Sequence, residues 1–268
     1  MDFKDKVVLI TGASSGIGQR LAIDLAARGA TVVGCGRSLE RLQETANELK
    51  RYSSSSTVHV CDVSSPQQVK ETVEKVVSQF GKIDILINNA GFGLYQSFAD
   101  IPLDAIESMV RTNFLGAVYC AKEVLPSMIA RRSGHIINIS SVAGKIGTPY
   151  MAAYCSTKFA LIGLSESLYH ELRPHGIHVS VICPGPVRTK MHLLFDRMTL
   201  GAPEFLILKT EDVSRVVIRM IEKERFQAII PSWLAAVCFF KALAPNLFRV
   251  VSYHLLRSPL LQKIRRTP

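Results

Sequence analysis

The feature that most constrains how this chain can fold is a glycine-rich turn near its N-terminus. Residues 6–11 are largely apolar, as in a strand that is buried on both faces, and residues 17–28 carry leucines at helical spacing. Glycines between them allow a tight turn and a close approach of the backbone to a pyrophosphate, to which the helix N-terminus adds free N–H groups and a favourable dipole. The turn reads Thr11-Gly12-Ala13-Ser14-Ser15-Gly16-Ile17-Gly18. Its place in the first strand–helix connection predicts a dinucleotide site, against the alternative of an ordinary glycine-rich turn.

Strand and helix patterns alternate along most of the chain. Apolar runs predict strands at 6–11, 31–35, 57–61, 83–88, 135–140, 177–183 and 227–230. Helical spacing predicts helices at 17–28, 38–51, 66–80, 103–130, 151–172 and 211–222. Because this alternation implies parallel strands joined by right-handed crossovers, we predict one α/β domain over residues 1–230. Its expected fold is a doubly wound (Rossmann) parallel sheet of about seven strands, with helices on both faces.

The composition excludes several classes of site. The chain has 268 residues, of which 48% are hydrophobic and 20% charged, and this suits a globular protein with a substantial core. Its six cysteines are scattered without C-x-x-C spacing and its seven histidines are dispersed, so we expect neither a disulfide framework nor a metal site. The N-terminus lacks a charged segment followed by a long apolar one, so we expect no signal peptide and a cytoplasmic protein.

The spacing of the turn, T-G-x-x-x-G-x-G, resembles the fingerprint of the short-chain dehydrogenase/reductase family. Three later motifs resemble that family in the same order: Asp62-Val63, Asn88-Asn89-Ala90-Gly91 and Pro184-Gly185. The resemblance implies that the first holds the adenine ring, that the second lies beside the cofactor, and that the third lies near the nicotinamide. The expected cofactor contacts are Gly12, Ser14, Ser15, Gly16, Ile17, Gly18, Asp62, Val63, Asn89, Ala90, Gly91, Tyr154, Lys158, Pro184, Gly185, Val187 and Thr189.

The end of the second predicted strand indicates which cofactor is used. An acidic residue there would bind the ribose 2′-hydroxyl of NAD, whereas this chain has Gly36 and Arg37, and no acid before Glu40. An arginine suits a 2′-phosphate because it forms charge-assisted, often bidentate hydrogen bonds. We therefore predict NADP(H), with Arg37 as the discriminating residue. The alternative is that Arg37 is a solvated residue at a helix start.

A tyrosine–lysine pair supplies the expected reaction centre. Tyr154 and Lys158 are four residues apart, which places them on one face of a helix. The ammonium is expected to lower the pKa of the phenol, so that Tyr154 exchanges a proton with a carbonyl or alcohol oxygen. Ser141, thirteen residues before Tyr154, matches the family's spacing and is expected to stabilise charge on the substrate oxygen. Ser140 would point the other way by strand alternation, and Tyr150 lacks a lysine at this spacing.

The resemblance adds Asn113, whose implied role is to hold a water that connects Lys158 to solvent. Its alternative reading is a polar residue inside a helix. Apolar residues that follow Pro184-Gly185 are expected to line the substrate site or, equally, to pack on the body as a lid. They are Met191, Leu193, Leu194, Phe195, Met198, Leu200, Phe205, Leu206 and Ile207, with Phe92, Leu94 and Tyr95 on one wall.

These residues predict NADPH-dependent reduction of an apolar, lipid-like ketone or aldehyde. Two alternatives stay open: NADP-dependent oxidation of a sterol-like secondary alcohol, and a weakly catalytic NADP(H)-binding scaffold. The presence of Ser141, Tyr154, Lys158 and Asn113 together argues against the scaffold. The resemblance also implies a homodimer or homotetramer.

Residues 231–268 are predicted to be a basic, apolar helical extension. After Glu224 the chain holds seven basic residues and no acid, and residues 246–257 have helical periodicity. The apolar run from Trp233 to Phe240 is too short to span a bilayer. Basic, acid-free apolar helices suit an anionic membrane surface, so we expect peripheral membrane contact through residues 232–268. The alternative is a tail that packs over the substrate mouth or a partner subunit. We expect no nucleic acid, because the basic residues lack a pattern for base stacking or groove reading.

Overall fold

Parallel pairing joins every pair of neighbouring strands in the sheet. The computed structural model describes residues 3–189 and 207–256, and within them seven strands stand in the order β3-β2-β1-β4-β5-β6-β7. The strands are β1 (Val7–Thr11), β2 (Thr31–Gly36), β3 (Thr57–Val60), β4 (Ile85–Asn88), β5 (Gly134–Ile139), β6 (Ile177–Pro184) and β7 (Gln227–Ile230). This order confirms the predicted single-domain α/β fold with a doubly wound, Rossmann-type parallel sheet.

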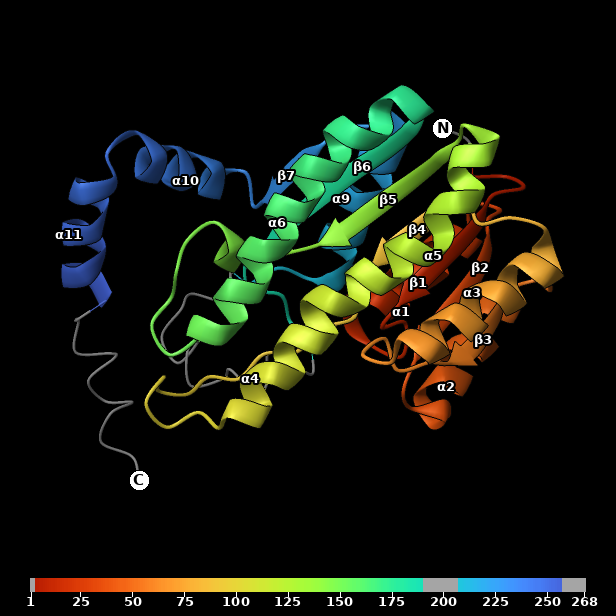
Figure 1. Cartoon of the computed structure of the whole chain (residues 1–268), viewed down its shortest axis with the longest axis horizontal. Helices are drawn as coiled ribbons and strands as arrows, with labels where there is room; N and C mark the ends of the chain where they lie inside the picture. Colours follow the sequence, from red (N-terminus) through yellow and green to blue (C-terminus); the bar gives the residue numbers. More distant parts are fainter. Residues whose placement is uncertain (1–2, 190–206, 257–268) are drawn as a thin grey trace.

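Helices cover both faces of this sheet (Figure 1). One face carries α1 (Gly16–Ala26), α2 (Leu39–Lys50) and α9 (Thr210–Lys223), and the other carries α3 (Pro66–Phe80), α5 (Gly116–Arg131) and α6 (Ala152–Leu172). Side chains of β1 alternate between the two layers. Val8 and Ile10 belong to the core with α1 and α9, whereas Val7 and Leu9 belong to the core with α3 and α5. Burial on both faces explains why the strands are continuous apolar runs.

The helical stretch predicted over 103–130 contains three segments. α4 (Leu103–Val110) runs into a π-helical turn, η1 (Arg111–Leu115), before α5 begins. Within that turn the Asn113 side chain bonds to Phe92 and to Thr157 of α6. Such turns are frequent at functional sites, and residue spacing does not reveal them.

Two helices follow the last strand of the sheet. α10 (Trp233–Leu243) and α11 (Pro245–Leu256) cover the apolar run and the helical periodicity of the sequence. Figure 1 shows α11 at the edge of the molecule, beyond the sheet. No residue of α10 is buried. Among the described residues, none of the helices combines the length and apolar content that crossing a bilayer requires.

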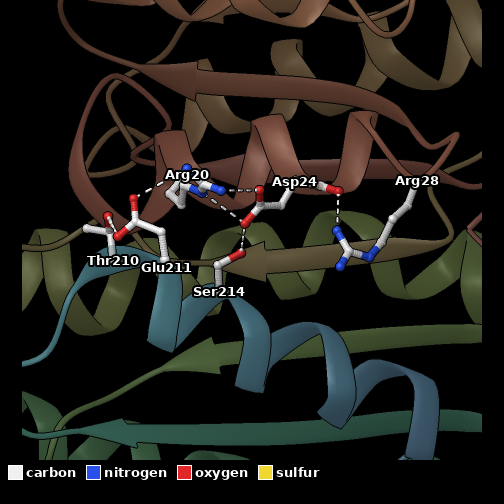
Figure 2. Close-up of polar contacts among 6 residues, drawn as sticks. All are labelled: Arg20, Asp24, Arg28, Thr210, Glu211 and Ser214. Atoms are coloured by element: carbon white, nitrogen blue, oxygen red, sulfur yellow. Dashed lines mark hydrogen bonds and ion pairs between the residues drawn. The ribbon is translucent and has the colours of Figure 1, made fainter.

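A network of polar side chains joins α1 to α9 (Figure 2). Asp24 accepts hydrogen bonds from the Arg20 guanidinium, with Nη2 and Oδ1 2.9 Å apart, and from the Ser214 hydroxyl at 2.6 Å. Arg20 also lies 3.3 Å from the Glu211 carboxylate. Ser214 is fully buried, so Asp24 is the acceptor that this hydroxyl requires in the core. The network therefore holds α9 against the helix that follows the glycine-rich turn.

Asp24→Ala is expected to lower the free energy of unfolding by about 1–3 kcal/mol, because the buried Ser214 hydroxyl and Arg20 lose an acceptor. Urea unfolding followed by circular dichroism measures the change. Glu48→Ala is the matched control, since it breaks the exposed Arg51–Glu48 pair and should cost less than about 1 kcal/mol. Equal losses in the two variants would contradict the stabilising role of the network.

A buried histidine lies where β5 meets β6. His135 is fully buried, its Nε2 lies 2.7 Å from Ser180 Oγ, and Ser180 Oγ donates to the Arg225 carbonyl oxygen. The Ser180 hydroxyl uses its only proton in the hydrogen bond to the Arg225 carbonyl, so it can only accept from His135. Nε2 of His135 therefore carries the ring proton and donates to Ser180 Oγ. Nδ1 then has neither a proton nor a hydrogen-bond partner among the described residues. Burial, together with the nearby His178, lowers the pKa of His135 to about 3.

Because His135 is buried and neutral, we expect the free energy of unfolding to fall in acid. An unfolded histidine binds a proton near pH 6.5, whereas His135 in the fold stays neutral to about pH 3, so the unfolded state binds more protons between these values. Its contribution to stability is complete above about pH 6.5 and is lost as the pH falls towards about 3, by about 1.4 kcal/mol per pH unit.

Urea titrations across that pH range measure the slope. His135→Gln should remove most of the slope that His135 contributes to the dependence of stability on pH, because glutamine keeps a donor for Ser180 but does not titrate. His254→Gln, on the exposed side of α11, should keep the wild-type slope. A wild-type slope in His135→Gln as well would refute the assignment.

Candidate active site

The turn after β1 and residues 89–91 after β4 meet at the carboxyl edge of the sheet. Strand order reverses between these two strands, and such a reversal opens a crevice at the carboxyl ends of parallel strands. A cavity of about 370 Å³ lies there. All the predicted catalytic and cofactor-binding residues except Gly18 and Asn113 line it: Gly12, Ser14, Ser15, Gly16, Ile17, Arg37, Asp62, Val63, Asn89, Ala90, Gly91, Ser141, Tyr154, Lys158, Pro184, Gly185, Val187 and Thr189.

Gly18 shapes this cavity without lining it. A Cβ atom at Gly18 would lie 2.3 Å from the Gly12 carbonyl oxygen and 2.4 Å from Asn89 Nδ2. The absence of a side chain lets Asn89 Nδ2 donate to the carbonyl oxygens of Thr11 and Gly12, at 3.0 and 3.2 Å. Gly12 and Gly16 have φ values of 67° and 59°, which favour glycine. The loops after β1 and β4 are thereby tied together.

The start of α1 fits a pyrophosphate. Ser15 precedes the helix but makes no side-chain hydrogen bond to its first turn, so these N–H groups have no cap from that side chain. The first turn also contains no acidic residue. N–H donors at the positive end of a helix favour an anionic phosphate. The residues present therefore fit a dinucleotide.

A second arginine, which the sequence pattern did not identify, lines the same cavity. Arg37 follows β2, and Arg41 lies four residues later in the first turn of α2. Ser38 caps this helix by accepting from the Arg41 backbone N–H at 3.4 Å. Glu40 is exposed to solvent. The available signal was a second arginine four residues after Arg37, in the first turn of the predicted helix.

Tyr154, Lys158 and Ser141 meet in the part of the cavity next to β5, β6 and α6. Lys158 Nζ lies 5.7 Å from the centre of the Tyr154 ring and donates to the Ile139 carbonyl oxygen at 2.9 Å. Ser141 follows β5, and its Oγ accepts from the Ala143 backbone N–H at 3.1 Å. The cavity thus brings together one hydroxyl, one phenol and one ammonium from two segments of the chain.

Burial dominates the ionisation of the phenol and the ammonium. It raises the pKa of Tyr154 to about 12, against the opposing effect of a hydrogen bond with Ser141. It also lowers the pKa of Lys158 to about 8. The pKa of Tyr154 is therefore shifted in the direction opposite to the predicted one, because loss of water around the phenol disfavours its charged form. Tyr154 therefore keeps its proton at neutral pH.

The two adjacent serines after β5 have different partners. Ser140 Oγ donates to the Lys158 carbonyl oxygen at 3.0 Å and so ties β5 to α6. Ser141 Oγ instead lies 3.3 Å from the Pro184 carbonyl oxygen, beside Tyr154. Their hydroxyls diverge, as strand alternation predicts.

Asn113 does not line the cavity. Its Oδ1 accepts from the Phe92 N–H at 2.9 Å, and its Nδ2 donates to the Phe92 carbonyl oxygen at 2.8 Å and to Thr157 Oγ1 at 3.1 Å. The Asn113 amide therefore holds the segment after Gly91 against α6. Its contact on α6 is Thr157, the residue that precedes Lys158. Its expected role in a proton relay stays a prediction.

Some of the apolar residues that were predicted to line the substrate site lie within the described part of the chain. Phe92 lines the cavity, and Leu94 and Tyr95 pack in the same cluster with Met151. Of the segment predicted to close over the substrate, Ile207 is half-buried. Its other members lie outside the described residues: Met191, Leu193, Leu194, Phe195, Met198, Leu200, Phe205 and Leu206.

Known proteins of one family are similar to this chain along most of its length. The sequence pattern that defines short chain dehydrogenases matches residues 6–197. Epidermal retinol dehydrogenase 2 of Mus musculus is 36% identical over 246 residues, which cover 90% of this chain and 78% of that protein.

Two solved structures are similar in fold. A short chain dehydrogenase/reductase of Burkholderia phymatum in complex with NAD has a TM-score of 0.84 and 26% identity, and the match covers 92% of this chain and 96% of that one. An actinorhodin polyketide ketoreductase with NADPH has a TM-score of 0.78 and 31% identity, over 84% of this chain and 95% of that one. The chain therefore belongs to the short-chain dehydrogenase/reductase family of oxidoreductases, whose fold binds a nicotinamide dinucleotide.

Proposed function

We propose that this protein is an NADPH-dependent carbonyl reductase that acts on an apolar, lipid-like ketone or aldehyde. One observation carries the proposal: the cavity that contains Ser141, Tyr154 and Lys158 also contains Arg37 and Arg41. The two arginines follow β2, and the other three residues lie beside β5 and α6, so the cavity extends across the sheet edge between them. Two guanidinium groups suit a 2′-phosphate, and a phenol with a hydroxyl suits a carbonyl oxygen.

The ionisation of the site supports reduction. A bound nicotinamide dinucleotide would supply the hydride for the carbonyl carbon. Tyr154, protonated at neutral pH, donates its proton to the carbonyl oxygen, so that the product is a neutral alcohol. The Ser141 hydroxyl stabilises the charge that develops on that oxygen. Lys158, held by the Ile139 carbonyl, stabilises the tyrosinate that remains until solvent returns a proton.

Apolar side chains support a bulky, apolar substrate. Phe92, Val142, Ala143 and Met151 line the cavity on the side of the reactive residues. A cluster of apolar residues from α4 and the loop after β4 packs behind them. Such a wall favours a hydrocarbon group next to the reacting carbonyl.

Oxidation of an alcohol is the second candidate, because one similar protein is named a retinol dehydrogenase. A panel of ketones and aldehydes of increasing chain length, followed by loss of NADPH absorbance, tests the main proposal. Turnover that rises with chain length would support it. Turnover only with NADP⁺ and alcohols would move the assignment to oxidation. NADPH binding without either reaction would indicate a binding protein of weak activity.

A further inference from the structure

The exposed apolar side chains of this protein are concentrated on its last two helices. Eight of the fifteen large hydrophobic residues that are exposed within the described part of the chain lie on α10 and α11. We define them as the docking face: Trp233, Phe239, Phe240, Leu243, Leu247, Val250, Val251 and Tyr253. Soluble monomers rarely leave such a set of neighbouring apolar groups in water. The face therefore indicates a partner.

The charge of this segment indicates which partner. Arg249 lies on α11, and no acidic residue occurs after Glu224. The sequence beyond the described residues adds Arg257, Lys263, Arg265 and Arg266. A second copy of the chain would bring the same basic segment and a net charge of +10 towards it. An anionic lipid surface instead complements both properties, since it accepts apolar side chains and attracts cations.

We propose that α10 and α11 form a membrane-docking unit that lies in the interface of an anionic bilayer. α11 packs chiefly against α10, and the rings of Phe240 and Phe248, 6.1 Å apart, connect the two helices. Leu247, Val250 and Val251 follow the i, i+3, i+4 spacing of one helix face. Short helices of this kind lie in the interface, with their apolar side chains in the lipid.

Contacts in the last turn of α10 connect this unit to the cavity. Lys241 Nζ donates to the Lys145 carbonyl oxygen, and its ammonium lies 5.0 Å from the centre of the Phe159 ring. Lys145 ends the short helix that follows Ser141, and Phe159 directly follows Lys158. Docking therefore places the cavity next to the lipid surface. That an apolar substrate would enter the cavity from the lipid rests on the proposed carbonyl reduction. The docking itself requires no activity.

Trp233 provides a direct test, since it is the only tryptophan in the chain and its side chain is half exposed. Its emission should shift to shorter wavelength with vesicles of phosphatidylcholine and phosphatidylserine, and brominated acyl chains should quench it. Free phosphoserine should leave the emission unchanged. The protein should sediment with these vesicles and far less with phosphatidylcholine alone. An absence of both the shift and sedimentation would overturn the proposal.

Matched substitutions locate the contact. Leu243 and Val250 are 72% and 56% exposed, so the double variant Leu243→Gln/Val250→Gln should fold normally, with vesicle affinity reduced by about tenfold or more. Leu103→Gln/Val60→Gln changes residues that are 77% and 54% exposed elsewhere, and it should bind as the wild type does. Arg249→Gln should lower affinity about fivefold for anionic vesicles only.

Thermal unfolding and NADPH binding confirm that each variant is folded. Wild-type vesicle affinity in the Leu243/Val250 variant would overturn the proposal. A second result would also overturn it: light scattering shows that the wild type is a dimer and the Leu243/Val250 variant a monomer, and the wild type binds no vesicles. The docking face would then join two copies of the chain.

Discussion

Tyr154→Phe is expected to lower kcat for carbonyl reduction by about 10²- to 10⁴-fold, because the carbonyl oxygen loses its proton donor. A water molecule in its place would be a weaker acid, since bulk water has a pKa of about 15.7 and the buried phenol has a pKa of about 12. Affinity for NADPH should change only a few-fold, since the substitution removes one hydroxyl and leaves the rest of the cavity unchanged. Steady-state loss of NADPH absorbance gives kcat, and quenching of Trp233 fluorescence gives the affinity.

Tyr150→Phe is the matched control. Tyr150 precedes Tyr154 by four residues, but its ring packs against Tyr95, with centroids 5.2 Å apart, and it does not line the cavity. Its loss of a hydroxyl should leave kcat within a few-fold of the wild-type value. A Tyr154→Phe enzyme that keeps wild-type turnover, or a Tyr150→Phe enzyme that loses it, would assign the proton donor to another group.

Arg37→Gln/Arg41→Gln is expected to raise KM for NADPH by about 10- to 100-fold and to leave KM for NADH unchanged. Each charge-assisted hydrogen bond to the 2′-phosphate contributes about 1.5–3 kcal/mol, and exposure of both side chains favours the lower value. Glutamine keeps much of the side-chain length, so the change removes charge while the walls of the cavity stay in place. Initial rates with each cofactor measure the two constants.

Arg51→Gln, at the opposite end of α2, is the control for the loss of positive charge on that helix. It pairs with Glu48 at the surface and should not alter either constant. If KM rises equally for NADPH and NADH in the double variant, the arginines contact a part that both cofactors share. If neither constant changes, NADP(H) selectivity is not located at this edge of the sheet.

Local patterns in the sequence were enough to predict the fold. The first strand, the glycine-rich turn and the first helix each have a short-range signal, because burial on two faces, left-handed backbone and helical spacing are properties of neighbouring residues. Motif order then places Asp62, Asn89, Ser141 and Pro184 at strand ends, and parallel strands bring those ends to one edge. The lining of the cavity by these residues follows from that geometry.

Contacts between distant segments could not be read in the same way. Arg41 joins the cavity because Ser38 starts α2 at a particular residue. Asn113 points to Phe92 and Thr157 because a π-helical turn shifts the helix register there. Residue 18 must be glycine because a Cβ atom there would collide with the Gly12 carbonyl oxygen and the Asn89 side chain, which lie 6 and 71 residues away in the sequence. Such effects depend on which atoms meet after folding, and no periodicity encodes them.

By itself, the sequence predicted the parallel sheet and most of the residues that line the cavity at its carboxyl edge, since both follow from strand order and motif spacing. Only the tertiary structure decided the ionisation of Tyr154 and Lys158. The expected attraction between phenolate and ammonium is a pairwise effect that spacing predicts. Desolvation is a collective effect of β5, β6 and α6 around both groups, and it shifts the two pKa values to about 12 and about 8.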